Sequence, residues 1–238
     1  MPYDQDLAYI HDAGFTDLAR NAAAVVLKLL RNHKLQNGLI VDLGCGSGVL
    51  AERLTRAGYN VWGVDISESM LKLARKRAPT ARFVRGSLFR TKLPTCVAVT
   101  AIGECINYLF DRRGADQLAD FFQRVYRALT PRGVFVLDVA QPGHVSKPPL
   151  LHSEGEDWAI LVTKEEDARR RVLTRRMTIF RKVGRRYRRS QEVHEQRLFP
   201  LAQIVSALES AGFDVTRVSG YGSERFAPGR AGFVALKR

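Results

Sequence analysis

Three glycines, Gly44, Gly46 and Gly48, directly follow a short apolar stretch, and this pattern is typical of a nucleotide-binding turn. The apolar residues of Ile40–Leu43 predict the end of a buried strand, and Val49–Leu54 resumes a helical period. Because glycine has no Cβ, the backbone between them can turn sharply and approach a ligand closely. A strand, a glycine-rich turn and a helix N-terminus together predict a site for a nucleotide-type ligand.

Two carboxylates flank this turn and narrow the choice of ligand. Asp42 lies two residues before Gly44, and Asp65 ends the next predicted strand, about 20 residues on, where an acid can accept hydrogen bonds from both ribose hydroxyls. The glycine spacing is Gly-x-Gly-x-Gly rather than the Gly-x-Gly-x-x-Gly of dinucleotide sites. The Asp42 carboxylate would also repel a pyrophosphate, whereas it suits a cofactor that carries a cation. A dehydrogenase is therefore disfavoured.

The elements around the turn alternate between strand and helix. Apolar periodicity predicts helices over 16–33, 48–57, 67–77 and 114–129, and strands over 39–43, 59–65, 81–85, 96–102 and 134–139. Near-continuous apolar strands separated by amphipathic helices predict a parallel sheet with helices on both faces.

The pattern changes after Pro142. A strand is predicted over 158–163, followed by a long hairpin of strands 171–183 and 186–198 that turns at Gly184 and Arg185. A helix over 201–211 and strands over 213–218 and 232–236 then return to the first pattern. We expect a core formed by 1–142 and 199–238, and an inserted antiparallel β subdomain over 143–198 that contributes to the substrate site.

The charge is strongly positive and unevenly distributed. The net charge is +14, and 12 of the 38 basic residues lie between Lys164 and Arg189. Such a stretch could follow a phosphate backbone, or it could be a solvated face of the predicted hairpin. Few aromatic residues interrupt it beyond Phe180 and Tyr187, which favours the solvated face.

Other classes of protein are disfavoured by the composition. No apolar run approaches the roughly 20 residues of a membrane span, and the acidic N-terminal residues are unlike a signal peptide. A cytoplasmic protein without membrane contact is expected. The three cysteines, Cys45, Cys96 and Cys105, lack zinc-ligand spacing and are expected to be buried thiols, so no metal is predicted.

The stretch Val41–Gly48 closely resembles the first motif of class I S-adenosylmethionine-dependent methyltransferases. The resemblance continues through Asp65, through 103–109 after the fourth strand, and through 129–134 and 211–213. It implies an α/β fold with a Rossmann-like seven-stranded sheet whose last strand is antiparallel. It also implies S-adenosyl-L-methionine as the cofactor.

Carried over by position, the resemblance implies roles for the turn and its acids. The turn would pack against the methionine part and ribose of the cofactor, and Asp42 would face the ammonium end, directly or through water. Asp65 would bind the ribose hydroxyls. Ser87 stands where the family usually has an acid for the adenine amino group, and a hydroxyl can still accept that bond. The predicted cofactor-binding residues are Asp42, Gly44, Cys45, Gly46, Gly48, Asp65, Ile66, Ser87, Leu88 and Gly103.

The acceptor would approach from the carboxyl edge of the sheet, where such folds bind ligands. Glu104, Asn107 and Tyr108 follow the fourth strand at this edge. In similar enzymes an N-terminal lead, here residues 1–15, folds over the cofactor, and its candidate contacts are Tyr3, Tyr9 and His11. Along the second hairpin strand, Glu192, His194 and Gln196 share one face by the period of two. That face is either solvated or directed at the cleft.

If the face is directed at the cleft, His194 becomes a candidate general base and Glu192 an anchor for an amine. The candidate catalytic residues are therefore His194, Glu104 and His11. The candidate substrate-binding residues are Tyr3, Tyr9, Asn107, Tyr108, Glu192 and Gln196.

The leading hypothesis is a methyltransferase that modifies nitrogen or oxygen of a small molecule, because a short lead and one inserted sheet are enough to enclose such an acceptor. Methylation of RNA along the basic hairpin is an alternative. The Asn/Asp-Pro-Pro-aromatic signature of nucleobase methylation is missing, since Gly103–Ile106 stands in its place. A non-catalytic cofactor-binding protein remains a third possibility, because a fold does not guarantee chemistry.

Overall fold

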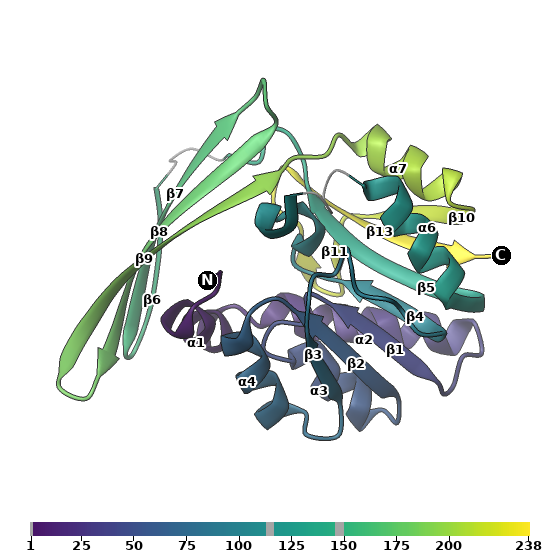
Figure 1. The fold of residues 1–238 in the computed structure, drawn as a ribbon, viewed down its shortest axis with the longest axis horizontal. Coiled ribbons are helices and arrows are strands. Elements are labelled where there is room, and N and C mark those ends of the chain that lie inside the picture. The colour runs from purple at the N-terminus through teal and green to yellow at the C-terminus, as the bar shows by residue number, and fades with distance from the viewer. Residues whose placement is uncertain (1, 113–116, 146–149) are drawn as a thin grey trace.

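Two sheets organise the chain in the computed structural model, which describes residues 2–112, 117–145 and 150–238. The larger sheet has seven strands in the order β10-β13-β5-β4-β1-β2-β3, and the smaller has four in the order β6-β7-β8-β9 (Figure 1). A two-stranded pair, β11-β12, completes the described strands. The predicted fold class is confirmed.

The seven-stranded sheet is parallel except for one strand. Strand β1 pairs in parallel with β2 and β4, whereas β13 runs antiparallel to both β5 and β10. The chain leaves β1 toward one edge and later returns to the other side of it, so the strand order reverses between β1 and β4. Ligands bind at such a point, beyond the carboxyl ends of the strands. The strands are β1 (Leu39–Leu43), β2 (Asn60–Asp65), β3 (Arg82–Arg85), β4 (Cys96–Ala101), β5 (Leu129–Ala140), β10 (Phe213–Val218) and β13 (Arg230–Lys237).

Helices cover both faces of this sheet, because alternate residues of its central strands are buried on opposite sides. Phe135 and Val99 belong to the apolar cluster that includes α6 (Leu118–Ala128) and α7 (Leu201–Ser210). Val136 and Ala98 belong to the cluster formed with α2 and α3. Figure 1 shows α6 and α7 on one side of the sheet and α2, α3 and α4 on the other. These last helices are α2 (Asp17–Asn32), α3 (Val49–Arg56) and α4 (Glu68–Arg77).

The smaller sheet is entirely antiparallel, and its long β8–β9 hairpin turns at Gly184, which has a φ of 61°. Its strands are β6 (Leu150–Gly155), β7 (Trp158–Asp167), β8 (Val172–Val183) and β9 (Arg186–Arg197). All four fall within the segment 143–198. Helix α1 (Gln5–Gly14) lies between this sheet and the core (Figure 1), where its residues Leu7 and Ile10 pack against apolar residues of β7 and β8. The N-terminal lead therefore connects the two sheets.

Several boundaries differ from the prediction. Residues 129–133 belong to β5 rather than to a turn before it. The register shifts where Cys96 pairs with Leu129 and Ala98 with Val134, so extra residues, including Arg132 with a φ of 63°, bulge from the strand. Strand β6 and the pair β11 (Gly220–Tyr221) and β12 (Glu224–Arg225) were not predicted, because they are short or largely exposed and carry weak periodicity. The start of the helix predicted over 114–129 lies outside the described residues.

Among the residues that the structure describes, no helix is both long and apolar enough to cross a membrane.

Candidate active site

A cavity opens at the carboxyl ends of β1, β2 and β4, and the N-terminal lead covers part of it. Its empty volume, including the open mouth, is about 1080 Å³, which is enough for a cofactor-sized ligand. Most predicted cofactor-binding residues line it, and so do several residues of the lead. The lining includes Gly44, Cys45, Gly46, Asp65, Ile66, Ser87, Leu88, Gly103, Tyr108, Phe110, Asp111, Tyr3 and His11.

The three glycines of the turn all have a positive φ, but for different steric reasons. A Cβ on Gly44 would lie 2.6 Å from the Cβ of Cys105, and a Cβ on Gly48 would lie 2.9 Å from the Cα of Ala74. A Cβ on Gly46 would meet nothing within 4 Å. Gly44 and Gly48 thus permit close packing of the protein, whereas Gly46 keeps the cavity open.

Asp65 connects this turn to the start of α4. Its Oδ2 accepts a hydrogen bond from the backbone N–H of Gly46 at 2.9 Å, and its Oδ1 accepts one from Ser67 N–H at 2.8 Å. Burial raises the pKa of Asp65, and these backbone bonds oppose the rise. Each carboxylate oxygen retains a lone pair that can accept a ligand hydroxyl.

Asp42 is almost completely buried and incompletely paired. Its Oδ1 accepts a hydrogen bond from Thr100 Oγ1 at 2.8 Å, while its Oδ2 has no partner among the described residues. Burial raises the pKa of Asp42 to about 7. The side chain is not part of the cavity lining, so an ammonium group in the cavity would reach it most readily through an ordered water, and the unpaired oxygen is suited to accept from one.

A third carboxylate, Asp111, which the sequence did not indicate, lies beside Ser87. The Ser87 hydroxyl donates to Asp111 Oδ2 at 2.7 Å, and Arg90 donates from Nε and Nη2 to the two oxygens of Asp111, each at 2.7 Å. Both Ser87 and Asp111 line the cavity. Asp111 thus supplies an acid next to the position where the family usually has one. No spacing rule reveals this, because the two residues lie 24 positions apart.

The N-terminal lead is fastened on both sides. Glu192 accepts hydrogen bonds from the backbone N–H groups of Tyr3 and Asp4, both at 2.8 Å, and the Ser67 hydroxyl donates to the carbonyl of Tyr3 at 2.8 Å. The hydroxyls of Tyr3 and Tyr108 are also 2.8 Å apart. Strand β9 and helix α4 therefore hold Tyr3 at the rim of the cavity.

His194 lies behind these tyrosines rather than in the cavity wall. Its side chain is 3% exposed, and its Nε2 is 2.7 Å from Glu192 Oε2. The rings of Tyr3, Phe110 and Tyr108 surround it, with centroid distances of 4.9, 5.0 and 5.7 Å. All three rings line the cavity, whereas His194 and Glu192 border a shallow depression outside it.

The other two predicted residues of the lead, His11 and Tyr9, lie in different places. His11 lines the cavity, its Nδ1 has no partner among the described residues, and burial lowers its pKa to about 4. Tyr9 instead packs on the inserted sheet, where its hydroxyl donates to Asp157 at 2.7 Å and Arg181 covers its ring.

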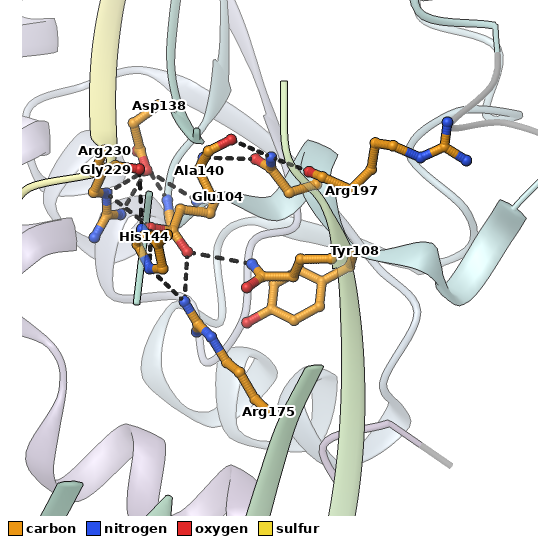
Figure 2. A network of polar contacts seen from close by, with 12 residues as sticks. Glu104, Tyr108, Asp138, Ala140, His144, Arg175, Arg197, Gly229 and Arg230 are labelled. Atoms are coloured by element: carbon orange, nitrogen blue, oxygen red, sulfur yellow. Dashed lines mark hydrogen bonds and ion pairs between the residues drawn. The ribbon is translucent and has the colours of Figure 1, made fainter. Parts of the chain in front are cut away.

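A buried polar network joins the two sheets next to the cavity (Figure 2). Asp138 accepts hydrogen bonds from the backbone N–H groups of Gly103 and Glu104 and from Arg230. The Glu104 carboxylate accepts from Arg175 Nη2 at 2.8 Å and from Gln196 at 3.2 Å. Burial opposes the ionisation of Glu104, but the charges of Arg175 and Arg230, with His144, outweigh it, and its pKa is lowered.

Asn107 belongs to the same junction. Its amide donates to the carbonyls of Ala140 and Arg197 and accepts from the backbone N–H of Ala140. These bonds use both N–H groups of the side-chain amide and one lone pair of its oxygen, so Asn107 joins β5 to β9. Across the described part of the chain, no group of three or more His, Cys, Asp or Glu side chains is arranged to hold a metal ion.

Comparison with known proteins identifies the family. Residues 40–133 match a family model described as a methyltransferase domain. A putative methyltransferase of Bacillus subtilis is 27% identical over 77% of this chain and 76% of its own length. A Streptomyces venezuelae enzyme named as a dTDP-3-amino-3,4,6-trideoxy-alpha-D-glucopyranose N,N-dimethyltransferase is 25% identical over 94% of this chain and 96% of its own. A solved S-adenosylmethionine-dependent methyltransferase from Clostridium acetobutylicum has the same fold, with a TM-score of 0.80 at 19% identity over 97% of both chains.

The chain is a class I S-adenosylmethionine-dependent methyltransferase. The residues of the cavity fit this cofactor. The cavity is open at Gly46, Asp65 lines it, and the buried Oδ2 of Asp42 has no hydrogen-bond donor among the described residues. Asp65 would hold the ribose of S-adenosyl-L-methionine, and Ser87 with Asp111 would meet the adenine amino group.

Filling the open space at Gly46 should abolish cofactor binding without unfolding the methyltransferase. We expect Gly46→Arg to eliminate the calorimetric signal with S-adenosylhomocysteine, because the new side chain occupies the cavity. Gly184→Arg is the matched control, since Gly184 also has a positive φ and open space but lies at the hairpin tip. Both variants bear a strain of about 1 kcal/mol, so equal loss of affinity in the two would contradict a cofactor site at Gly46.

The buried Asp42 should make stability depend on pH. Its pKa is about 7 when folded and near 3.8 when unfolded, so the folded state holds the proton more tightly. The free energy of unfolding should therefore fall as pH rises from about 4 to about 7, by on the order of 4 kcal/mol from this group. Asp42→Asn removes that loss. The free energy of unfolding of the variant, measured with denaturant, should therefore rise relative to that of wild type as pH increases across this interval. The control is Asp214→Asn at an exposed position, whose free energy of unfolding should differ from that of wild type by the same amount at every pH. If this control gained stability relative to wild type between about pH 4 and 7 as Asp42→Asn does, Asp42 would not be the source of the pH dependence.

Proposed function

We propose that this methyltransferase transfers a methyl group to nitrogen or oxygen of a small molecule. The observation that carries the proposal is the fastening of the N-terminal lead, because Tyr3 is bonded to both β9 and α4 at the rim of the cavity. The cavity that this lead partly covers extends beside Tyr108 and Gly103. The amino sugar nucleotide in the name of the Streptomyces venezuelae relative supports a small acceptor. In this proposal, the segment 143–198 forms one wall of the acceptor site.

The residues of the chain align the acceptor rather than activate the methyl group. S-adenosyl-L-methionine supplies a methyl group on a sulfonium, which is already a good leaving group. The protein then has to hold the acceptor atom in line and exclude water. Burial raises the pKa values of Tyr3 and Tyr108, so both hydroxyls stay protonated and can orient an amine or hydroxyl by hydrogen bonding.

The three candidate bases differ in availability. Glu104 is held by cations that lower its pKa, which makes it a weak proton acceptor. His194 shares its Nε2 with Glu192 and lies behind the tyrosines, so we infer that it positions Tyr3. His11 is uncharged at neutral pH and faces the cavity with an unpaired Nδ1, which suits it to accept a hydrogen bond from the acceptor.

A transfer screen tests the proposed acceptor class. The protein is incubated with radiolabelled S-adenosyl-L-methionine and either fractionated metabolites or total RNA, with Gly46→Arg as the inactive control. We expect label in the low-molecular-mass fraction only. Label in RNA would overturn the proposal and favour the basic hairpin as a phosphate track. Tight cofactor binding with no labelled product in any fraction would favour a non-catalytic role.

Glu192 and His194 should act through the lead rather than through proton transfer. We expect Glu192→Gln and His194→Ala each to weaken retention of S-adenosylhomocysteine and raise KM by roughly tenfold, since each disturbs the charge-assisted bonds that hold Tyr3. Because both act through Tyr3, their effects should not add. Glu154→Gln, at an exposed position of β6, is the control. Loss of one limb of the pH profile of kcat in His194→Ala, with KM unchanged, would instead identify His194 as a base.

A further inference from the structure

Two cations face each other on the inner surface of the inserted sheet. Lys164 of β7 pairs across the strands with Arg175 of β8, and Arg175 pairs with His194 of β9. Like charges directly opposite each other in a sheet are destabilising. Neither side chain is fully exposed, so solvent screens their repulsion only in part.

The nearby carboxylates are already engaged. Glu104 accepts from Arg175 and also lies 3.6 Å from His144 and 3.7 Å from Arg230. Asp138 is occupied by Arg230 and by two backbone N–H groups, and Glu166 accepts from Gly143 N–H. Among the described residues, none forms an ion pair or hydrogen bond with the ammonium group of Lys164. Lys164 therefore carries a charge that no described acid pairs with directly.

Arg175 also presents a donor without an acceptor. Its Nη2 donates to Glu104 and lies 3.1 Å from His144 Nε2, but its Nε is buried without a hydrogen-bond partner among the described residues. Burial, followed by the charge of Arg175, lowers the pKa of Lys164, which is the expected response of a cation that lacks a counter-ion. A ligand that brings negative charge would satisfy both groups.

Arg175 is the member of this pair that lies near the cofactor cavity, and neither cation is itself part of the cavity lining. The charge of Arg175 acts on the hydroxyls of both Tyr3 and Tyr108, lowering pKa values that burial raises. Figure 2 shows the Tyr108 ring with its hydroxyl on the side of Arg175. Since Tyr3 and Tyr108 line the cavity, an acceptor placed at the tyrosines would extend toward the cations.

We propose that Lys164 and Arg175 form a subsite for an anionic group, a carboxylate or a phosphate, carried by the methyl acceptor. The inference rests on the proposed small-molecule function and names its acceptor class. Guanidinium groups bind both anions through parallel N–H bonds, and an ammonium adds a point charge. The anion would be held at one end of the acceptor while the tyrosines orient its nitrogen or oxygen at the other.

Direct anion binding tests the subsite separately from methyl transfer. The protein saturated with S-adenosylhomocysteine is titrated with inorganic phosphate and, in parallel, with acetate, at constant ionic strength, by calorimetry and by the rise in Tm that binding to the folded state produces. We expect at least one of the two anions to bind, and their ratio to distinguish a phosphate from a carboxylate acceptor. Lys164→Gln should weaken that binding by about tenfold or more, with cofactor affinity unchanged.

Arg176→Gln is the matched control, because it removes the same charge from the exposed outer face of the same sheet. Arg175→Lys gives a second test, since it keeps the charge but loses the Nε donor, and it should weaken binding by less than Lys164→Gln. Failure of both anions to bind, or an equal loss in Lys164→Gln and Arg176→Gln, would overturn the subsite. Because cofactor binding and the transfer screen are measured independently, either result leaves the proposed methylation of a small molecule intact.

Discussion

The buried carboxylate of Asp138 is the interaction on which the rest of the site depends. It lies near the end of β5, is completely buried, and accepts hydrogen bonds from the consecutive backbone N–H groups of Gly103 and Glu104. Both residues have a positive φ, of 94° and 57°, which is costly for a glutamate. Asp138 stabilises that conformation, and Arg230 supplies the opposite charge. The loop after β4 is thus fixed where it borders the cavity.

The same loop connects the inserted sheet to the core. Because the backbone of Glu104 is held by Asp138, its carboxylate points to Arg175 and Gln196 on β8 and β9. Loss of one partner of such a buried ion pair usually costs about 3–5 kcal/mol, since the other charge remains buried. The network therefore sets the position of the inserted sheet more firmly than the apolar contacts alone. Glu192 on β9 then fixes the lead, so the order of dependence runs from Asp138 to Glu104, to β9 and finally to Tyr3.

The sequence predicted the parts that local rules govern. Most strands and helices of the core follow from apolar periodicity, and the β8–β9 hairpin follows from alternation around Gly184. The turn at Gly44–Gly48 and the acid Asp65 follow from spacing along one strand and its successor. The roles of Asp111 and Asp138 were not predicted, because their hydrogen-bond partners lie 24 and 35 residues away in the chain. The surroundings of His194 could not be predicted either. The period of two shows which face of β9 carries this residue, but not which residues cover that face.

The lead and the inserted sheet show how a basic surface can serve the fold. Of the basic residues between Lys164 and Arg189, Arg181 and Arg188 pair with the buried Asp6 of α1, and Arg175 pairs with Glu104. These arginines hold the lead and the loop after β4 in place, so they contribute to the site by positioning the residues that border the cavity. Lys164 differs from them because no described acid neutralises it, although it lies on the same inner face. A cation without a paired acid, next to a guanidinium whose Nε lacks an acceptor among the described residues, is the feature of this face that the proposed anionic group would complete.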